Sequence, residues 1–504
     1  MSEQEISMKP ISTGGDWNFE LLQEYDRAIA DIARNEFKLD VYPNQIEIIS
    51  SEQMLDAYAS TGMPIGYHHW SYGKEYLRHE QAYRKGTRGL AYELVINSDP
   101  CIAYLMEDNT MTLQALVIAH ACYGHNSFFK GNYLFRQWTN ADAIIDYLVF
   151  AKNFVMQCEE HHGVEAVEAL LDACHALQDY GVDRYQHPRP LSAGEELARM
   201  REREAHAWRQ YDDIWRTVPT KPAKDGASGR GVFPVEPQEN LLYFVEKYSP
   251  KLETWERELI RIVRKLAQYF YPQGQTKLMN EGWATFWHYT IVNRLFDKGL
   301  VDHGFMVEFL HLHTNVVCQR GFDEPGYGGL NPYALGFAMM QDIKRICERP
   351  DEEDRHWFPD IAGGDWLKVL DSAMRNYKDE SFITQFLSPR LIREFRLFAI
   401  GDHEDNPYYE IDSIHNDQGY RRVRHLLAGQ YNRDHLLPDI QVVRYDRDGD
   451  RSLTVRHRQH RNRPLNEEST KVMAHLARLW RFPVRLETMN HAGRRIDVEE
   501  FSAA

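Results

Sequence analysis

The sequence predicts a mainly α-helical core with short strands, followed by a small α+β domain at the C-terminus. The first observation is that apolar residues recur at helical spacing through most of 112–181 and 252–296. The second is that segments after about residue 400 alternate apolar and polar positions, as half-buried strands do. The chain of 504 residues is also longer than one hydrophobic core requires, which predicts more than one domain.

Composition along the chain sets the predicted domain limits. Residues 1–16 are expected to form a flexible N-terminal lead, residues 17–399 the helical core, and residues 400–504 the α+β domain. Within the core, residues 217–236 concentrate Pro, Gly, Lys and Ser. That composition predicts a linker or a long loop.

Helices are predicted in the core wherever apolar residues repeat with a period near 3.6. Asn331 followed by Pro332 marks one helix start, because asparagine caps a helix N-terminus and proline fits its first turn. The stretch "GLAYELVINSDPCIAYLME" instead predicts one or two short strands, broken at Ser-Asp-Pro. The predicted helices cover 18–37, 112–125, 142–163, 164–181, 195–215, 252–270, 277–296 and 331–348.

The C-terminal segment has the pattern of strands around one helix. "YYEIDSI", "IQVVRYDRDGDRSLTVRHRQ" and "PVRLETMN" predict strands, and the second of these predicts a hairpin that turns at Asp448-Gly449. A helix is predicted over residues 469–482, between strands.

Charge and cysteine content narrow the function classes. The formal net charge of −16 argues against a general nucleic-acid or anionic-membrane binder, since both need clustered positive charge. The six cysteines form no C-x-x-C pair, which argues against a disulfide framework or a cysteine-rich zinc site. The sequence has neither a signal-peptide pattern nor an apolar run of membrane-spanning length. We therefore expect a soluble cytoplasmic protein.

The stretch "AHACYGHNSFF" places His120 and His125 five residues apart in an apolar neighbourhood. On a regular α-helix, residues five apart are offset by about 140° and cannot share a metal ion. They could do so if the helix ends or carries a π-bulge near Gly124. The stretch also lacks the glutamate of the H-E-x-x-H zinc hydrolases, because Ala121 follows the first histidine.

The stretch "MNEGWATFWHY" supplies a carboxylate and a third imidazole. Glu281 and His288 are seven residues apart, which puts them within about 20° of one helix face. Two histidines from one helix and a glutamate from a later one match the three-ligand layout of zinc hydrolases. An N-cap at Asn280 would explain Glu281 in structural terms, but not His288.

The resulting hypothesis is a metal-dependent, hydrolase-like protein that binds zinc or another divalent ion. Its predicted metal ligands are His120, His125 and Glu281. His288 would be a fourth ligand or an acid/base group, and Tyr123 would donate a hydrogen bond to a developing oxyanion.

Two alternatives remain open. Glu159-x-x-His162 and Asp172-x-x-His175 repeat a carboxylate-x-x-His pattern on two predicted helices, as in di-iron and di-manganese bundles. Alternatively, the histidines are structural and the protein is a non-enzymatic assembly partner.

Several long motifs occur along the chain in this order: "YHHWSYGK", "ELVINSDPCIAYLMEDNT", "AHACYGHNSFFKGN", "DACHALQDYGVDRY", "YFYPQGQTKLMNEGWATFWH" and "GLNPYALGF". Together they resemble the SpoVR family, the stage V sporulation protein R-like proteins, from about residue 17 to the end. The resemblance implies a role in making the spore cortex, or in stress and stationary phase. It also implies two partners, a PrkA-like serine-kinase/AAA protein and a von Willebrand-type protein, and it implies no particular reaction.

Overall fold

The computed structural model groups the chain into two compact units by contact. Unit 1 combines Met1–Gln157 with Tyr269–Leu436, and unit 2 combines Cys158–Gln268 with Leu437–Ala504. The sequence instead predicts a domain boundary at residue 400. A grouping by contact does not test that boundary, so the predicted domain limits stay predictions. The residues that the structure describes are 9–59, 65–84, 93–185, 198, 201–202, 233–322, 324–398, 400–401, 405–408, 410–411, 415–459 and 464–502.

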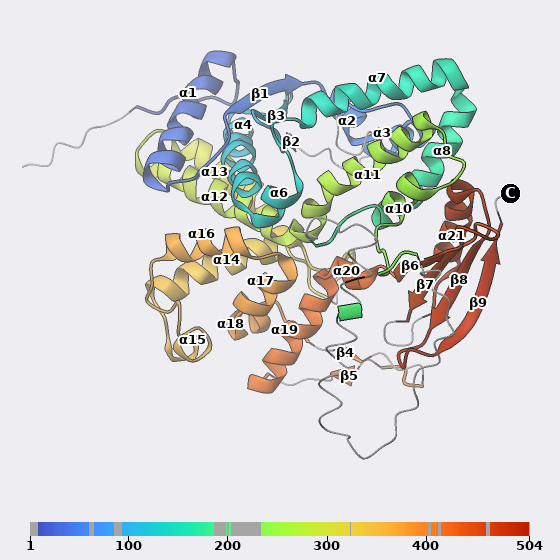
Figure 1. Cartoon of the computed structure of the whole chain (residues 1–504). Coiled ribbons are helices and arrows are strands. Elements are labelled where there is room, and N and C mark those ends of the chain that lie inside the picture. The colour runs from blue at the N-terminus through green and yellow to red at the C-terminus, as the bar shows by residue number, and fades with distance from the viewer. Residues whose placement is uncertain are drawn as a thin grey trace, which may run out of the picture. The chain divides into compact units, whose positions relative to one another are not determined.

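Helices make up most of unit 1 (Figure 1). Polar side chains cap several of them, and Asn331 caps α14 with Pro332 in its first turn, as predicted. Two segments, η1 and η2, are π-helices that continue α1 and α4. The helices are α1 (Phe19–Ala30), η1 (Asp31–Glu36), α2 (Ser51–Ala59), α3 (Trp70–Arg84), α4 (Met111–Val117), η2 (Ile118–His125), α5 (Asn126–Gly131), α6 (Tyr133–Trp138), α12 (Lys277–Asp297), α13 (His303–Val316), α14 (Pro332–Glu348), α15 (Glu352–Trp357), α16 (Trp366–Asn376), α17 (Asp379–Phe386), α18 (Pro389–Glu394), α19 (Asp417–Tyr431) and α20 (Arg433–Leu436), while α7 (Ile144–His162) and α11 (Thr254–Gln275) contribute residues to both units.

A three-stranded sheet is the main β-structure of unit 1. The strands are β1 (Asn44–Ile49), β2 (Glu93–Ile96) and β3 (Cys101–Met106), in the order β1-β3-β2. The central strand β3 is buried along its whole length and pairs in parallel with β1 and antiparallel with β2. The two strands predicted around Ser-Asp-Pro are thus confirmed as β2 and β3. The pair β4 (Ile400–Gly401) and β5 (Glu410–Ile411) is much shorter.

The π-helix η2 lies in the core of unit 1, with every residue buried. In a π-helix each backbone hydrogen bond spans five residues, so residues i and i+5 lie one above the other. The Ser127 hydroxyl donates to the carbonyl oxygens of Tyr123 and Gly124 at 2.6 and 2.9 Å, and it accepts from Trp283 Nε1 at 2.9 Å. These bonds satisfy backbone groups where the π-helix returns to an α-helix.

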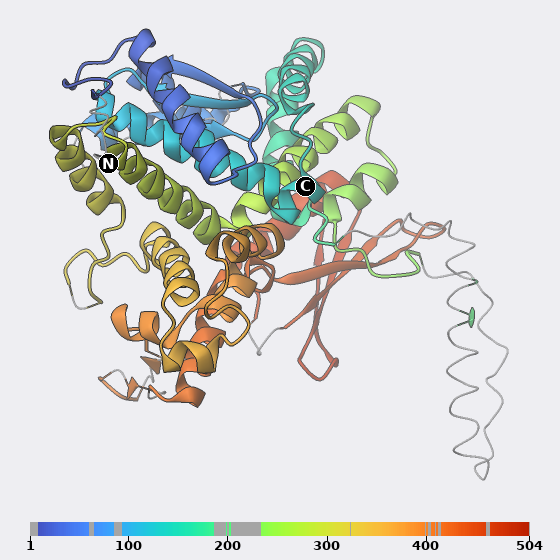
Figure 2. The ribbon, with the colours of Figure 1, turned by 90° about the vertical axis from the view of Figure 1, so that its left-hand side faces the viewer.

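Helix α12 packs against η2 on one side and α14 on the other, and Figure 2 shows α12 beside the α4–η2 segment. Glycines permit both contacts. A Cβ on Gly124 would lie 2.6 Å from Ala284 Cα, and one on Gly282 would lie 2.5 Å from the Gly336 backbone. The backbones of these helices therefore approach more closely than any larger residue would allow.

Unit 2 contains a four-stranded sheet with helices. Its order is β6-β7-β8-β9, with β7 and β8 parallel and the other pairs antiparallel. The predicted hairpin and the helix between strands are confirmed as β6–β7 and α21. The buried side chain of Trp480, at the end of α21, packs against Phe244 and Tyr445. The elements are α8 (Val164–Ala176), η3 (Gln178–Tyr180), α10 (Leu241–Tyr248), β6 (Asp439–Tyr445), β7 (Leu453–Arg458), α21 (Glu467–Trp480), β8 (Val484–Met489) and β9 (Arg495–Phe501).

The structure confirms the predicted class, a mainly helical protein with a small C-terminal sheet. Most of the predicted linker at 217–236 and of the predicted helix at 195–215 lie outside the described residues, as do residues 1–8 of the predicted lead. In the part of the chain that the structure describes, no helix combines the length and apolar character needed to cross a membrane.

The glycine contact between α12 and α14 gives a stability prediction. Gly336→Ala should destabilise the protein by about 3 kcal/mol or more, because the added Cβ would lie 2.4 Å from the Leu278 carbonyl oxygen. The matched control is Gly429→Ala on α19, where a Cβ meets nothing within 4 Å. The control should be neutral or stabilising by up to about 1 kcal/mol. Thermal unfolding of both variants measures this, and equal melting temperatures would contradict the close packing.

Candidate metal centre

The π-helix places His120 and His125 side by side. Their ring centroids are 4.6 Å apart, at an interplanar angle of 84°. Helix α12 turns Glu281 toward both rings, and Glu93, the first residue of β2, faces His120 from the sheet. Four side chains from three elements therefore converge in the core of unit 1.

The donor atoms have the spacing of metal ligands. His120 Nε2 lies 3.3 Å from Glu93 Oε1 and 3.9 Å from Glu281 Oε2, and His125 Nε2 lies 3.5 Å from Glu281 Oε2. Ligands held about 2.1 Å from an ion at tetrahedral corners lie about 3.4 Å from one another. Glu93, His120 and His125 form a group that could hold a metal ion, with one donor atom from each within 4.8 Å of the others.

The carboxylates of this cluster are short of partners. The side chains of Glu93 and Glu281 are 17% and 18% exposed. Glu93 Oε2 and Glu281 Oε2 are buried, and neither has a hydrogen-bond partner among the described residues. Buried polar atoms without partners are costly, and the positive charge of a bound cation nearby would offset that cost.

Burial also shifts the protonation equilibria of the cluster. It raises the pKa of Glu93 well above its usual value, and the charge of Glu281 raises that pKa further. It lowers the pKa of His120 well below its usual value, with smaller contributions from His125, His288 and His313. The site therefore favours a neutral imidazole, the form that binds metals, and disfavours uncompensated negative charge.

An amide orients His125. Its Nδ1 lies 2.9 Å from Asn280 Oδ1, so the ring nitrogen donates to the amide oxygen. That hydrogen bond leaves Nε2 as the lone-pair nitrogen facing Glu281. The structural alternative for Asn280, an N-cap, does not apply, because α12 begins three residues earlier, at Lys277.

Two further histidines continue from His120 into the core. His120 Nδ1 lies 2.9 Å from His288 Nδ1, and His288 Nε2 lies 2.8 Å from His313 Nδ1. Burial lowers the pKa of His288 well below its usual value and that of His313 to about 4. The three rings form a buried relay of neutral imidazoles.

The two hydrogen bonds between these neutral rings can be donated in only two ways, either from His120 toward His313 or from His313 toward His120. If His120 donates from Nδ1, then His288 donates to His313, and His120 Nε2 is left free to bind a metal. In the opposite direction, His120 Nε2 carries a hydrogen and faces the carboxylates. Both nitrogens of His288 are thus engaged by other rings, which suits a residue that orients His120 rather than a fourth ligand.

Tyr123 points its hydroxyl elsewhere. The hydroxyl donates to Asp26 Oδ1 at 2.8 Å, on α1. Burial raises the pKa values of both Tyr123 and Asp26. This contact gives the predicted oxyanion role of Tyr123 no support.

The residues of the di-metal alternative do not form a comparable cluster. Among the described residues, the group of Glu93, His120 and His125 is the one set of three that could hold a metal. His162 is exposed and stacks on Trp255, with ring centroids 4.2 Å apart. The structure therefore does not bring Glu159, His162, Asp172 and His175 together as ligands.

Reasoning from the sequence missed Glu93, Asn280 and His313 as members of this site. Glu93 had one available signal, since it is an acidic residue at the start of an apolar strand, "ELVIN". His313 lies in "HLHTN", where no spacing relates it to His120 or His288.

Comparisons with known proteins cover nearly the whole chain. The family model described as "SpoVR like protein" matches residues 16–436, and the one described as "SpoVR-like C-terminal domain" matches residues 438–491. The "Uncharacterized protein YcgB" of Escherichia coli (strain K12) is 57% identical over 483 residues, which are 96% of this chain and 94% of that protein. No solved structure matches the chain. The chain therefore belongs to the SpoVR family.

Proposed function

We propose that this SpoVR-family protein is a metalloprotein with hydrolase-like chemistry. One observation carries the proposal: two imidazoles and two carboxylates converge with their donor atoms at the spacing of metal ligands, and one oxygen of each carboxylate is buried without a hydrogen-bond partner. These side chains are His120, His125, Glu93 and Glu281. A structural role for the histidines would leave those oxygens unexplained.

Zinc is the ion that we propose. Imidazole donors suit zinc, iron and copper, and carboxylates extend the range to manganese. Donor spacings of 3.3–3.9 Å match a small tetrahedral site, which zinc favours, whereas manganese favours octahedral oxygen sites. When bound, such an ion lowers the pKa of water and polarises a carbonyl or phosphoryl oxygen.

The two glutamates take different roles in this proposal. Glu281 Oε2 faces both imidazole nitrogens, which is the position of a third ligand. Glu93 faces His120 from the sheet and would accept a proton from water. It would thereby take the role of the glutamate that the H-E-x-x-H motif supplies in other zinc hydrolases.

Metal content tests the site directly. The untagged wild-type protein should contain about one zinc per chain by inductively coupled plasma mass spectrometry. His120→Ala and Glu281→Gln should lose the zinc because each removes a ligand. Glu93→Gln should retain it, because Glu93 is the proposed proton acceptor and not a ligand. His162→Ala and His175→Ala are the matched controls and should keep full metal content.

Two results would contradict this assignment. About two iron or manganese ions per chain that disappear in His175→Ala would establish the di-metal alternative. A metal-free wild type, with a melting temperature unaffected by chelators, would remove both metal hypotheses.

The histidine relay predicts a weaker but measurable effect. His288→Ala should lower metal affinity by about 10–100-fold without abolishing binding, because His120 loses the partner that orients it. His288→Asn should recover part of the affinity, since an amide can both accept and donate. Competition with a chromophoric chelator measures this, with exposed His311→Ala as the control. Wild-type affinity in a folded His288→Ala variant would show that the relay does not orient the ligand.

The family resemblance adds a proposal about partners and physiology. We propose that the protein acts in stress, stationary-phase or spore-cortex physiology, together with a PrkA-like serine-kinase/AAA protein and a von Willebrand-type protein. Co-purification of the tagged full chain with both candidates should recover them. The metal-free His120→Ala variant separates the two functions, because its binding to partners should be unchanged if the contacts do not use the metal centre. Recovery of neither candidate would contradict the assembly proposal and leave the metal proposal intact.

A further inference from the structure

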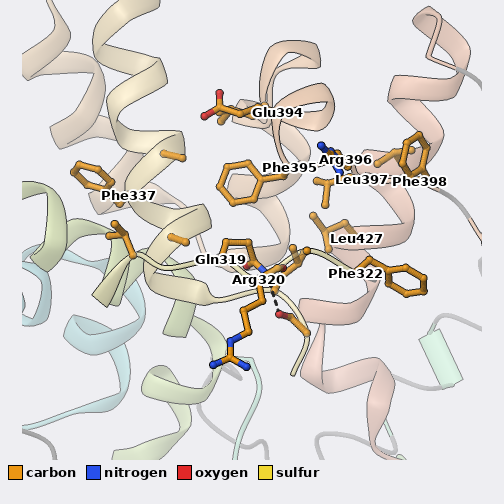
Figure 3. Close-up of a pocket in the computed structure, with 18 of the residues that line it drawn as sticks. Gln319, Arg320, Phe322, Phe337, Glu394, Phe395, Arg396, Leu397, Phe398 and Leu427 are labelled. Atoms are coloured by element: carbon orange, nitrogen blue, oxygen red, sulfur yellow. Dashed lines mark hydrogen bonds between the residues drawn. The ribbon is translucent and has the colours of Figure 1, made fainter. Parts of the chain in front are cut away.

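A cavity of about 1350 Å³ lies in unit 1, bounded by α14, α18, α19 and the segments 317–322 and 324–330 (Figure 3). Its lining carries four arginines and three acidic residues, so its charges do not select a ligand of either sign. None of the four side chains of the candidate metal centre lines it. The cavity therefore adds neither a ligand nor a residue to the metal centre.

The N-terminus of α12 receives no cap from its own segment. Thr276 occupies the N-cap position, but its side chain makes no capping hydrogen bond. Its hydroxyl instead donates to the carbonyl oxygen of Pro272 at 2.8 Å. Because the first N–H groups of a helix have no partner within the helix, those of α12 need an acceptor from another part of the chain.

Asp379, the first residue of α17, supplies that acceptor. Its Oδ2 accepts from the backbone N–H of Leu278, and its Oδ1 accepts from that of Met279, both at 2.9 Å. Asp379 and Met279 are 100 residues apart in the sequence. One carboxylate from a distant helix therefore binds two successive N–H groups in the first turn of α12, where the helix dipole also favours a negative charge.

Asp379 differs from an ordinary helix cap because it is buried. The residue is 1% exposed. Burial raises the pKa of Asp379 to about 7; the two backbone donors lower this pKa, and the charge of Glu281 raises it further. A carboxylate is costly to bury, and the effect of Glu281 indicates that the two carboxylates lie near each other.

The turn that Asp379 binds leads directly into the candidate metal centre. Met279 is followed by Asn280, whose Oδ1 lies 2.9 Å from His125 Nδ1. Next comes Glu281, whose Oε2 faces both imidazoles of η2. The two hydrogen bonds to Asp379 therefore fix the stretch of backbone from which both of these side chains extend.

We propose that Asp379 is a positioning residue of the metal centre. It holds the first turn of α12 so that Asn280 and Glu281 meet the histidines of η2, and it acts through the backbone without touching the ion. This role rests on the proposed function, since it requires that Glu281 binds a metal ion. Groups that orient metal ligands typically change metal affinity by about 10–100-fold when they are removed.

Titration of the full-length, metal-free protein with cobalt(II) tests this role. Cobalt(II) accepts the same nitrogen and oxygen donors as zinc, and its visible absorption reports the geometry of its ligands. Asp379→Asn keeps one acceptor oxygen and replaces the other with an NH₂ group. This variant should raise the Kd of cobalt(II) by about 10-fold and alter the visible spectrum, and Asp379→Ala should raise the Kd by about 100-fold.

Asp365 provides the matched control. Its side chain accepts from the backbone N–H groups of Leu367 and Lys368 at the start of α16, a helix that carries no residue of the metal centre. Asp365→Ala should lower the melting temperature, because a cap is lost, but it should keep the wild-type Kd and spectrum. If Asp365→Ala weakened cobalt(II) binding as much as Asp379→Ala, the effect would be one of stability alone and the positioning role would be overturned.

The outcomes separate this role from the metal centre itself. A wild-type protein that binds neither cobalt(II) nor zinc would contradict the metal centre, and the role of Asp379 with it. A wild-type protein that binds cobalt(II), together with a folded Asp379→Asn variant of unchanged Kd and spectrum, would overturn only the role of Asp379. Asp379→Asn keeps the test decisive if Asp379→Ala does not fold.

Discussion

The close approach of helix backbones at Gly124, Gly282 and Gly336 is the constraint on which the core of unit 1 depends. Gly124 brings η2 against Ala284 of α12, and Gly282 and Gly336 bring α12 against α14. These contacts fix the distance between the two imidazoles of η2 and the Glu281 side chain on α12. A Cβ added at any of these three glycines would push apart the helices that hold the candidate ligands in place.

The fold class followed from periodicity, since helical spacing and the hairpin at Asp448-Gly449 are local properties of the sequence. The site was only partly predictable. His120 and His125 could be selected because they lie five residues apart in one apolar stretch. Glu281 could be selected because it lies seven residues before His288, on the same helix face. Glu93 and His313 could not, because strand pairing and helix packing bring them close from distant parts of the chain, and one sequence does not reveal such contacts.

Without a bound cation, the candidate metal centre buries ionisable side chains whose charged forms burial disfavours. The pKa of Glu93 is raised and those of His120 and His288 are lowered, so burial disfavours the charged form of every one of these groups. A purely structural cluster of this kind would be more stable with apolar residues in place of the ionisable ones. A divalent ion reverses the balance, because it compensates the carboxylates and uses the imidazoles in the neutral form that burial already favours.

The π-helix also bears on how sites of this kind are recognised. Pattern searches for helical metal sites commonly require histidines four residues apart, because that spacing aligns them on an α-helix. In a π-helix the aligned spacing becomes five, so the pair His120 and His125 is the counterpart of an ordinary i,i+4 pair with one residue inserted. Motif definitions that allow histidines at positions i and i+5, when a small residue such as Gly124 lies between them, would retrieve sites that the i,i+4 rule misses.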